Sequence, residues 1–144
     1  GRLDLGGYFV KQQLHSDHFY RADDTSVYIS GGAFDAEGLS LDIKSGGLFG
    51  VGGLTGLGAS GSIMNATIIS SDGTALNSTS TGILNNITFG SDISTNGNFI
   101  IYSGLSFDDG ITVTKDNGNW YFQGTGDQHI STMVLLLHNS VVLL

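Results

Sequence analysis

The closest approach to a metal-binding motif in this sequence is His15-Ser-Asp-His18. Histidines three residues apart can share one face of a helix, and Asp17 can add an oxygen ligand. A stable site of this kind needs a further fixed ligand, but the other histidines, His129 and His138, are distant in the sequence. We therefore favour a solvated or interface histidine pair, and we expect no metal site.

The carboxylates include two adjacent pairs, Asp23-Asp24 and Asp108-Asp109. Glycoside hydrolysis needs two carboxyl groups that face each other across a cleft, whereas adjacent side chains point apart, so neither pair is suited to it. Aspartates in loops are more natural ligands for Ca²⁺, but the D-x-[DN]-x-[DN]-G spacing of a calcium loop is missing. Because most turn aspartates hydrogen-bond their own backbone, a structural Ca²⁺ is the minor alternative.

Motifs for a catalytic nucleophile or a nucleotide are also missing. There is no G-x-S-x-G elbow, and the glycine-rich segment lacks the Gly-Lys-Ser/Thr ending of a phosphate-binding loop. We expect no catalytic residue and no cofactor.

The aromatic segment Trp120-Tyr-Phe122 has two interpretations. Trp120 can be a glycan contact, because an exposed aromatic strand can stack against a sugar. Alternatively, Trp120 and Phe122 share one side of an alternating strand and are core residues, with Tyr121 on the opposite side. We favour the core interpretation.

Three segments match the N-glycosylation sequon: Asn65-Ala-Thr67, Asn77-Ser-Thr79 and Asn86-Ile-Thr88. Such sequons are glycosylated only in a eukaryotic secretory pathway. In a chain so rich in Ser, Thr and Asn, chance occurrence is the alternative.

The composition excludes several classes of partner. The 144 residues carry a net charge of −8 and only 12% are charged, so the few Lys and Arg cannot neutralise nucleic-acid phosphates or anionic lipid. The absence of Cys excludes disulfides and thiolate metal sites. The longest apolar run, residues 133–137, is far shorter than the roughly 20 residues of a membrane-spanning helix. We expect no nucleic-acid or membrane partner, and any leader peptide absent or already removed.

The chain divides into two parts at about residue 26. Residues 1–25 show no sustained periodicity, and we interpret them as an N-terminal arm that packs on something other than its own core. Residues 26–144 alternate apolar and polar positions in short strands, spaced about ten residues apart and divided by Asp-Gly and Asn-Gly turns. This pattern predicts an all-β domain, an antiparallel β-sandwich or jelly roll. No internal repeat is convincing.

The glycine-rich segment at residues 46–62 has three interpretations. It can be an irregular strand or loop whose missing side chains let backbones or subunits approach closely, which we favour. It can be a hinge that orders on binding, or a membrane-inserting segment that resembles a viral fusion peptide in composition. A lone chain that exposed its large apolar residues would aggregate, so we predict burial in an assembly interface. These residues are Leu48, Phe49, Val51, Leu54 and Leu57.

Residues 64–113 resemble small β-rich virion proteins of tailed bacteriophages, namely head-decoration (cement), head-fibre and related accessory proteins. The resemblance lies in a strand, the turn Ser71-Asp-Gly-Thr74, a polar stretch at residues 90–97, and the segment Ile101-Tyr-Ser-Gly-Leu-Ser-Phe-Asp-Asp-Gly-Ile-Thr-Val113. It covers about a third of the chain and is a pattern of turns. It implies a non-enzymatic, symmetric assembly protein, often trimeric, that joins or caps shell subunits.

The sequence therefore predicts a non-enzymatic virion structural protein, a homotrimer or larger assembly that also binds other shell proteins. Tyr8, Phe9, Val141 and Leu143 join the glycine-segment residues as predicted interface positions. One rival is an extracellular carbohydrate-binding module or tail-fibre receptor-binding tip, for which Trp120 and the turn aspartates would form the site. The other rival is a small glycoside hydrolase.

Overall fold

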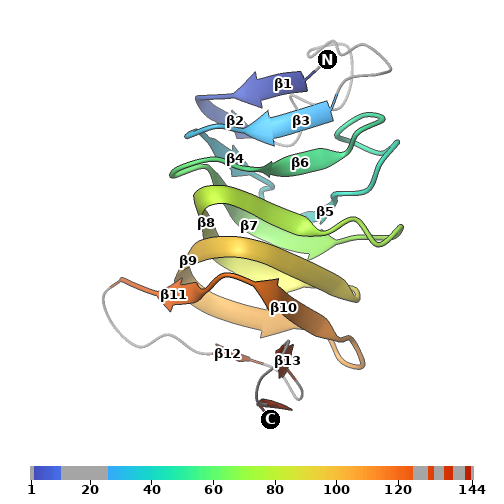
Figure 1. Ribbon diagram of the computed structural model, residues 1–144, viewed down its shortest axis with the longest axis vertical. Helices are drawn as coiled ribbons and strands as arrows, with labels where there is room; N and C mark the ends of the chain where they lie inside the picture. The colour runs from blue at the N-terminus through green and yellow to red at the C-terminus, as the bar shows by residue number, and fades with distance from the viewer. Residues whose placement is uncertain (1, 11–25, 125–129, 132–134, 138–141, 144) are drawn as a thin grey trace.

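The computed structural model describes residues 2–10, 26–124, 130–131, 135–137 and 142–143. In these residues the chain is all β without a helix, as predicted, and hence without a helix that could span a membrane. The strands run parallel and coil into a β-solenoid of about 5 turns, each turn lying below the one before it (Figure 1).

The strands follow one another around the coil. In chain order they are β1 (Arg2–Leu5), β2 (Tyr8–Val10), β3 (Ser26–Ile29), β4 (Ala33–Asp35), β5 (Ser40–Asp42), β6 (Leu54–Leu57), β7 (Ser62–Ile69), β8 (Leu76–Phe89), β9 (Ile93–Phe107), β10 (Val113–Asn117), β11 (Trp120–Phe122), β12 (Ile130–Ser131), β13 (Leu135–Leu137) and β14 (Val142–Leu143).

Parallel pairing stacks these strands into three faces. Face A contains β1, β3, β6, the beginnings of β8 and β9, β10 and β13. Face B contains β2, β4, the first half of β7, the middle of β8 and β9, and β11. Face C contains β5, the ends of β7, β8 and β9, and β12. The long strands β8 and β9 bend around all three faces.

The core consists of inward side chains that lie above one another in register. On face B the buried column is Phe34, Ile63, Leu84 and Ile101, and on face C it is Leu41, Ile68, Phe89 and Phe107. Strands alternate their side chains between two sides, and paired strands lie about 4.8 Å apart, so equivalent residues of successive turns touch. The alternating sequence pattern therefore builds a continuous apolar interior.

The corner between faces B and C is built by polar residues with positive φ. Asn65, Asn86 and Ser103 have φ angles of 54°, 58° and 64°, which Asn tolerates better than most residues. The Asn86 amide Nδ2 donates to Asn65 Oδ1 at 3.0 Å, and Asn65 Nδ2 donates to Asp35 Oδ1 at 3.2 Å. Two of the three sequon asparagines thus form a hydrogen-bonded ladder across three turns.

The prediction of an antiparallel β-sandwich or jelly roll is wrong. Each described strand of the coil pairs in parallel with the turn above or below, and only β13 and β14 form an antiparallel strand pair in the described chain. The predicted Asp-Gly and Asn-Gly turns do have positive φ, at Gly73, Gly97, Gly110 and Gly118. However, these glycines turn the chain around the solenoid and do not close hairpins.

The predicted N-terminal arm includes part of the solenoid. β1 pairs with β3, and β2 pairs with β4, so residues 2–10 form the first turn. Leu5 is buried in the common core. Residues 11–25 of the predicted arm lie outside the described residues.

The glycine-rich segment packs largely against its own chain. Phe49, Leu54 and Leu57 are buried in the core, Leu48 is half-buried against it, and Val51 is 54% exposed. Short backbone hydrogen bonds, such as Gly46 N–H to the Gly50 carbonyl at 2.7 Å, fold the loop before β6. The burial that the sequence analysis assigned to neighbouring subunits is thus supplied within the chain for three of the five residues.

Candidate functional site

The outer surface of face B carries apolar side chains in successive turns. The strand register places its outward residues in two columns: Tyr8, Ala33, Ser62, Ile83, Ile100 and Tyr121 in the first, and Val10, Asp35, Met64, Asn85 and Tyr102 in the second. From β7 downwards the apolar members are Met64, Ile83, Ile100, Tyr102 and Tyr121, which we call the face B patch. Tyr121 is 43% exposed and the other four are partly exposed.

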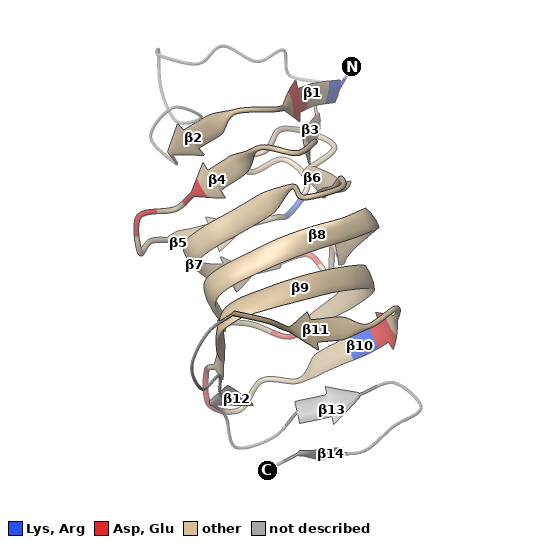
Figure 2. Ribbon diagram, turned by 90° about the vertical axis from the view of Figure 1, so that its left-hand side faces the viewer, with Lys and Arg blue, Asp and Glu red and all other residues tan. Residues whose placement is uncertain are grey.

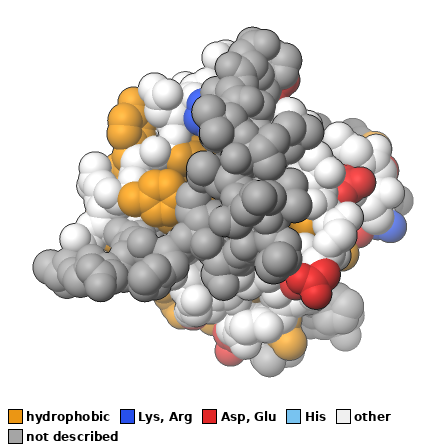
Figure 3. Space-filling model, turned by 90° about the horizontal axis from the view of Figure 1, so that it is seen from below, with side chains coloured by type: hydrophobic (Ala, Val, Ile, Leu, Met, Phe, Trp, Pro, Cys, Tyr) orange, Lys and Arg blue, Asp and Glu red, His pale blue; other side chains and the backbone are white. Residues whose placement is uncertain are grey.

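The strands that carry the face B patch contain no charged residue. This is true of the whole of β7, β8, β9 and β11, and β8, β9 and β11 face the viewer as uninterrupted tan ribbons in Figure 2. Seen from below, the largest hydrophobic areas lie on this same side, at the left of Figure 3. Since the chain has a net charge of −8, two copies repel least where they meet through this surface.

The sequence contained a signal for this patch that the alternation analysis missed. β9 holds a continuous apolar run, Phe99-Ile-Ile-Tyr102. Phe99 and Ile101 point into the core, so Ile100 and Tyr102 point outward. A strand that is apolar on both sides is typically covered on both sides.

The other predicted interface residues are distributed between the surface, the core and the undescribed ends. Tyr8 is 60% exposed at the top of the face B column, and Phe9 is half-buried against the core. Val141 lies outside the described residues. Leu143 belongs to β14, but only its backbone is described.

Trp120 occupies an inward position, as the favoured core interpretation predicted. β11 places Trp120 opposite the buried Phe99, with Tyr121 on the outer side. Phe122, which the same interpretation placed in the core, lies opposite the buried Ile101 but is itself 39% exposed. The Trp120 indole N–H donates to the buried Thr95 Oγ1 at 3.2 Å. This half-buried ring is poorly placed to stack against a glycan.

Turn aspartates connect successive turns at the corner between faces C and A. Asp42 accepts the Ser71 hydroxyl at 2.7 Å, and Asp72 accepts the Ser45 N–H at 3.1 Å. The Thr74 hydroxyl and N–H lower the pKa of Asp72 by hydrogen bonding to its carboxylate. The bond from the Thr74 N–H to Asp72 is of the predicted kind, in which a turn aspartate binds its own backbone. The bonds to Ser71 and Ser45 connect neighbouring turns, which was not predicted.

No group of three or more His, Asp or Glu residues that could hold a metal occurs in the part of the chain that the structure describes. The predicted candidates His15, Asp17, His18 and the pair Asp23-Asp24 lie outside it.

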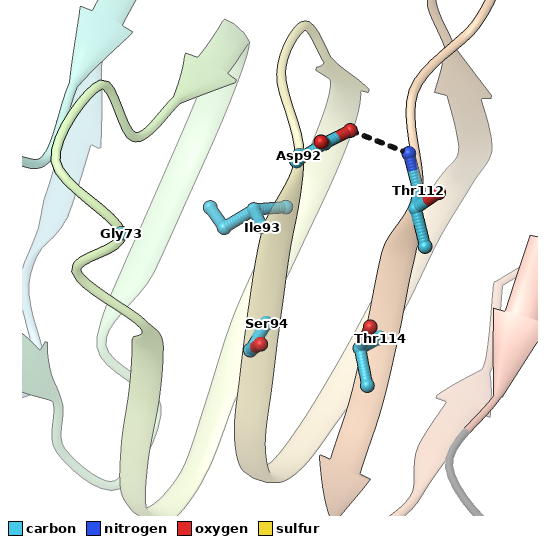
Figure 4. A pocket seen from close by; sticks show the side chains of 6 residues that line it. All are labelled: Gly73, Asp92, Ile93, Ser94, Thr112 and Thr114. Atoms are coloured by element: carbon cyan, nitrogen blue, oxygen red, sulfur yellow. Dashed lines mark hydrogen bonds between the residues drawn. The ribbon is translucent and has the colours of Figure 1, made fainter.

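A shallow groove of about 310 Å³ lies on face A beside this corner. Of its lining residues, Gly73 comes from the loop before β8, and Asp92 from the loop before β9. Ile93 and Ser94 lie on β9, Thr112 immediately precedes β10, and Thr114 lies on β10 (Figure 4). The Thr112 N–H donates to Asp92 Oδ1 at 2.8 Å. The groove therefore presents one carboxylate and three hydroxyl groups.

Comparisons with protein-family models, with curated proteins and with solved structures found no match for this chain.

Proposed function

We propose that this protein is a non-enzymatic structural component that assembles into a homo-oligomer through the face B patch. The observation that supports the proposal best is that residues 99–102 of β9 are apolar on both sides of the strand, with Ile100 on the outer side among strands that carry no charged residue. Burying an aliphatic side chain of this size contributes about 1.5–3 kcal/mol. The patch residues are already partly buried, so each contributes only part of this amount, and their sum must exceed the free-energy cost of association.

The interface in this proposal differs from the one expected from the sequence alone. Phe49, Leu54 and Leu57 already lie in the core of one copy, so we assign the contact to Met64, Ile83, Ile100, Tyr102 and Tyr121. Tyr8 continues the first column at the top of the solenoid and can extend the contact.

Placement of this assembly in a virion, as a capsid-decoration or related accessory protein, rests on the resemblance of residues 64–113 to tailed-bacteriophage proteins. Four of the five patch residues, all except Tyr121, lie within the segment that carries the resemblance, on β7, β8 and β9. A trimer or larger assembly that binds other shell proteins is the form that the resemblance implies.

The proposal is tested by Ile100→Lys, with Ser106→Lys as the matched control. Both residues point outward from β9, but Ile100 lies on face B and Ser106 on face C. We expect Ile100→Lys to raise the dissociation constant of the oligomer at least about tenfold, and Ser106→Lys to leave it unchanged, as measured by light scattering over a range of concentrations. Equal effects of the two variants would contradict an interface on face B.

A further inference from the structure

The groove on face A has the chemistry of a ligand site that is independent of the face B patch. Asp92 belongs to the loop before β9 and Ser94 lies on β9. Thr112 immediately precedes β10, and Thr114 lies on β10. Ser94 and Thr114 are register partners on neighbouring strands, so their side chains lie side by side on the outer surface. Figure 4 shows both residues below Asp92 and Thr112.

One hydrogen bond orients the carboxylate of the groove. The backbone N–H of Thr112 donates to Asp92 Oδ1 at 2.8 Å. A carboxylate has about four acceptor positions, so this bond leaves most of its capacity for a ligand. The hydroxyl groups of Ser94, Thr112 and Thr114 can each donate and accept.

The charge and the size of the groove restrict the class of ligand. Its lining contains one anionic group and no cation, and the chain carries a net charge of −8, which disfavours phosphates and other anions. A single carboxylate without further acidic or histidine ligands is a poor cation site. The volume of about 310 Å³ lies at the lower end of ligand pockets.

We propose that this groove binds one residue of a neutral saccharide. Asp92 accepts hydrogen bonds from sugar hydroxyl groups, while Ser94, Thr112 and Thr114 donate to and accept from neighbouring hydroxyl groups. Glycan recognition is thereby assigned to the groove and not to Trp120, whose indole N–H binds Thr95 in the interior. Because the groove is open and its lining lacks an aromatic ring, we expect a weak dissociation constant, on the order of 1 mM.

The test is an NMR titration of the whole chain with glucose, galactose, mannose and N-acetylglucosamine, and with sialic acid as an anionic comparison. Asp92→Asn keeps an oxygen for the Thr112 N–H but removes the charge, and Thr114→Val removes one hydroxyl at constant shape. Thr88→Val, at an outward position of face C, is the matched control. Backbone spectra of each variant establish that the fold is retained.

We expect at least one neutral sugar to shift the amide signals of the lining residues. Asp92→Asn and Thr114→Val should each weaken its binding at least about fivefold, and Thr88→Val should not change it. The proposal is overturned if no neutral sugar shifts these signals, if the two groove variants bind as well as the control, or if sialic acid binds more tightly than every neutral sugar. None of these results depends on the oligomeric state.

Discussion

At the scale of single residues, Phe49 shows that a glycine-rich loop can contribute a core side chain. Its ring lies 5.6 Å from the ring of Phe34, at an interplanar angle of 60°, and both are completely buried. Such tilted aromatic pairs contribute free energy beyond the area that they bury. The loop before β6 therefore contributes a buried side chain to the core, although it is not a regular strand.

Phe49→Ala should lower the free energy of unfolding by about 3–5 kcal/mol, because it removes a buried aromatic ring and leaves a cavity. Val51→Ala is the control, and it should change stability by less than about 0.5 kcal/mol because Val51 is largely exposed. Urea titrations of the two variants measure the difference. If Phe49→Ala dissociated the oligomer without destabilising the fold, Phe49 would belong to a subunit interface, as the sequence analysis expected.

The hydrogen bond between Tyr8 and Asp35 makes the first turn sensitive to acid. The Tyr8 hydroxyl donates to Asp35 Oδ2 at 2.5 Å, and this bond, with the Glu37 N–H and the Asn65 amide, lowers the pKa of Asp35 below its ordinary 3.8. The same bond raises the pKa of Tyr8. Since the pKa of Asp35 is lower in the folded state, its stabilising contribution is present above pH 3.8 and is lost as the pH falls through the lowered value.

Tyr8→Phe should reduce this pH dependence, because it removes the largest cause of the lowered pKa. We expect the stability difference between the unmodified chain and Tyr8→Phe to be small, largest near neutral pH, and to shrink as the solution becomes more acidic than pH 3.8. Thermal unfolding at a series of pH values measures it. A difference that grew towards acid pH would contradict the assigned direction.

At the scale of elements, close packing of successive turns requires glycine at specific positions. A Cβ atom on Gly61 would lie 2.2 Å from the Ile29 carbonyl oxygen of the turn above. Gly46 differs, because it has a φ angle of 77° but open space around its Cβ position. Gly61 is therefore required by the close approach of two backbones, whereas Gly46 is required only by its positive φ angle.

Gly61→Ala should therefore destabilise the chain more than Gly46→Ala. We expect a loss of about 1–2 kcal/mol for Gly46→Ala, which carries only the strain of a positive φ, and a larger loss for Gly61→Ala, because two backbones must separate. Denaturant midpoints of the two variants measure this order. The reverse order would show that the turns are not packed as closely as described.

The strands could largely be predicted from the sequence, but their pairing could not. The sequence predicted short strands divided by Asp-Gly and Asn-Gly turns after residue 26, and the described chain has strands there, among them β7, β8, β9 and β11, because alternation reveals which residues share a side. Alternation does not identify the neighbouring strand. Asp-Gly and Asn-Gly dipeptides did not help, since a hairpin and a solenoid corner both need positive φ.

The repeat was missed because the turns differ in length. Phe9, Phe34, Ile63, Leu84, Ile101 and Phe122 occupy equivalent positions in successive turns, and the intervals between them are 25, 29, 21, 17 and 21 residues. The loop before β6 and the segment between β2 and β3 cause the longest intervals. A fixed-period search therefore finds nothing, although the four middle positions, Phe34, Ile63, Leu84 and Ile101, form one buried column.

For the candidate site, the sequence predicted that large apolar residues must be buried, but it did not identify which part of the chain or which partner buries them. Phe49, Leu54 and Leu57 are covered by their own chain, whereas Ile100 and Tyr102 stand on the outer side of a strand whose inner side is already full. The two cases differ only in whether the side chain points into the core or away from it, and that direction depends on the fold.

At the scale of the whole molecule, the solenoid separates its charges from its apolar surface. The charged residues of its middle turns lie in corners and loops, including Asp72, Asp92, Asp108 and Asp109, while β7, β8 and β9 carry none. A net charge of −8 keeps copies apart in most orientations. The face B patch, whose strands carry no charged residue, is the surface through which association costs the least electrostatic free energy.

Sedimentation equilibrium of the unmodified chain over a wide range of concentrations tests this account most directly, because one copy has a mass of 15.0 kDa. The account predicts a mass of two or more copies at high concentration, and dissociation of Ile100→Lys to 15.0 kDa at concentrations at least about tenfold higher than for the unmodified chain. A mass of 15.0 kDa for the unmodified chain at every concentration would contradict it.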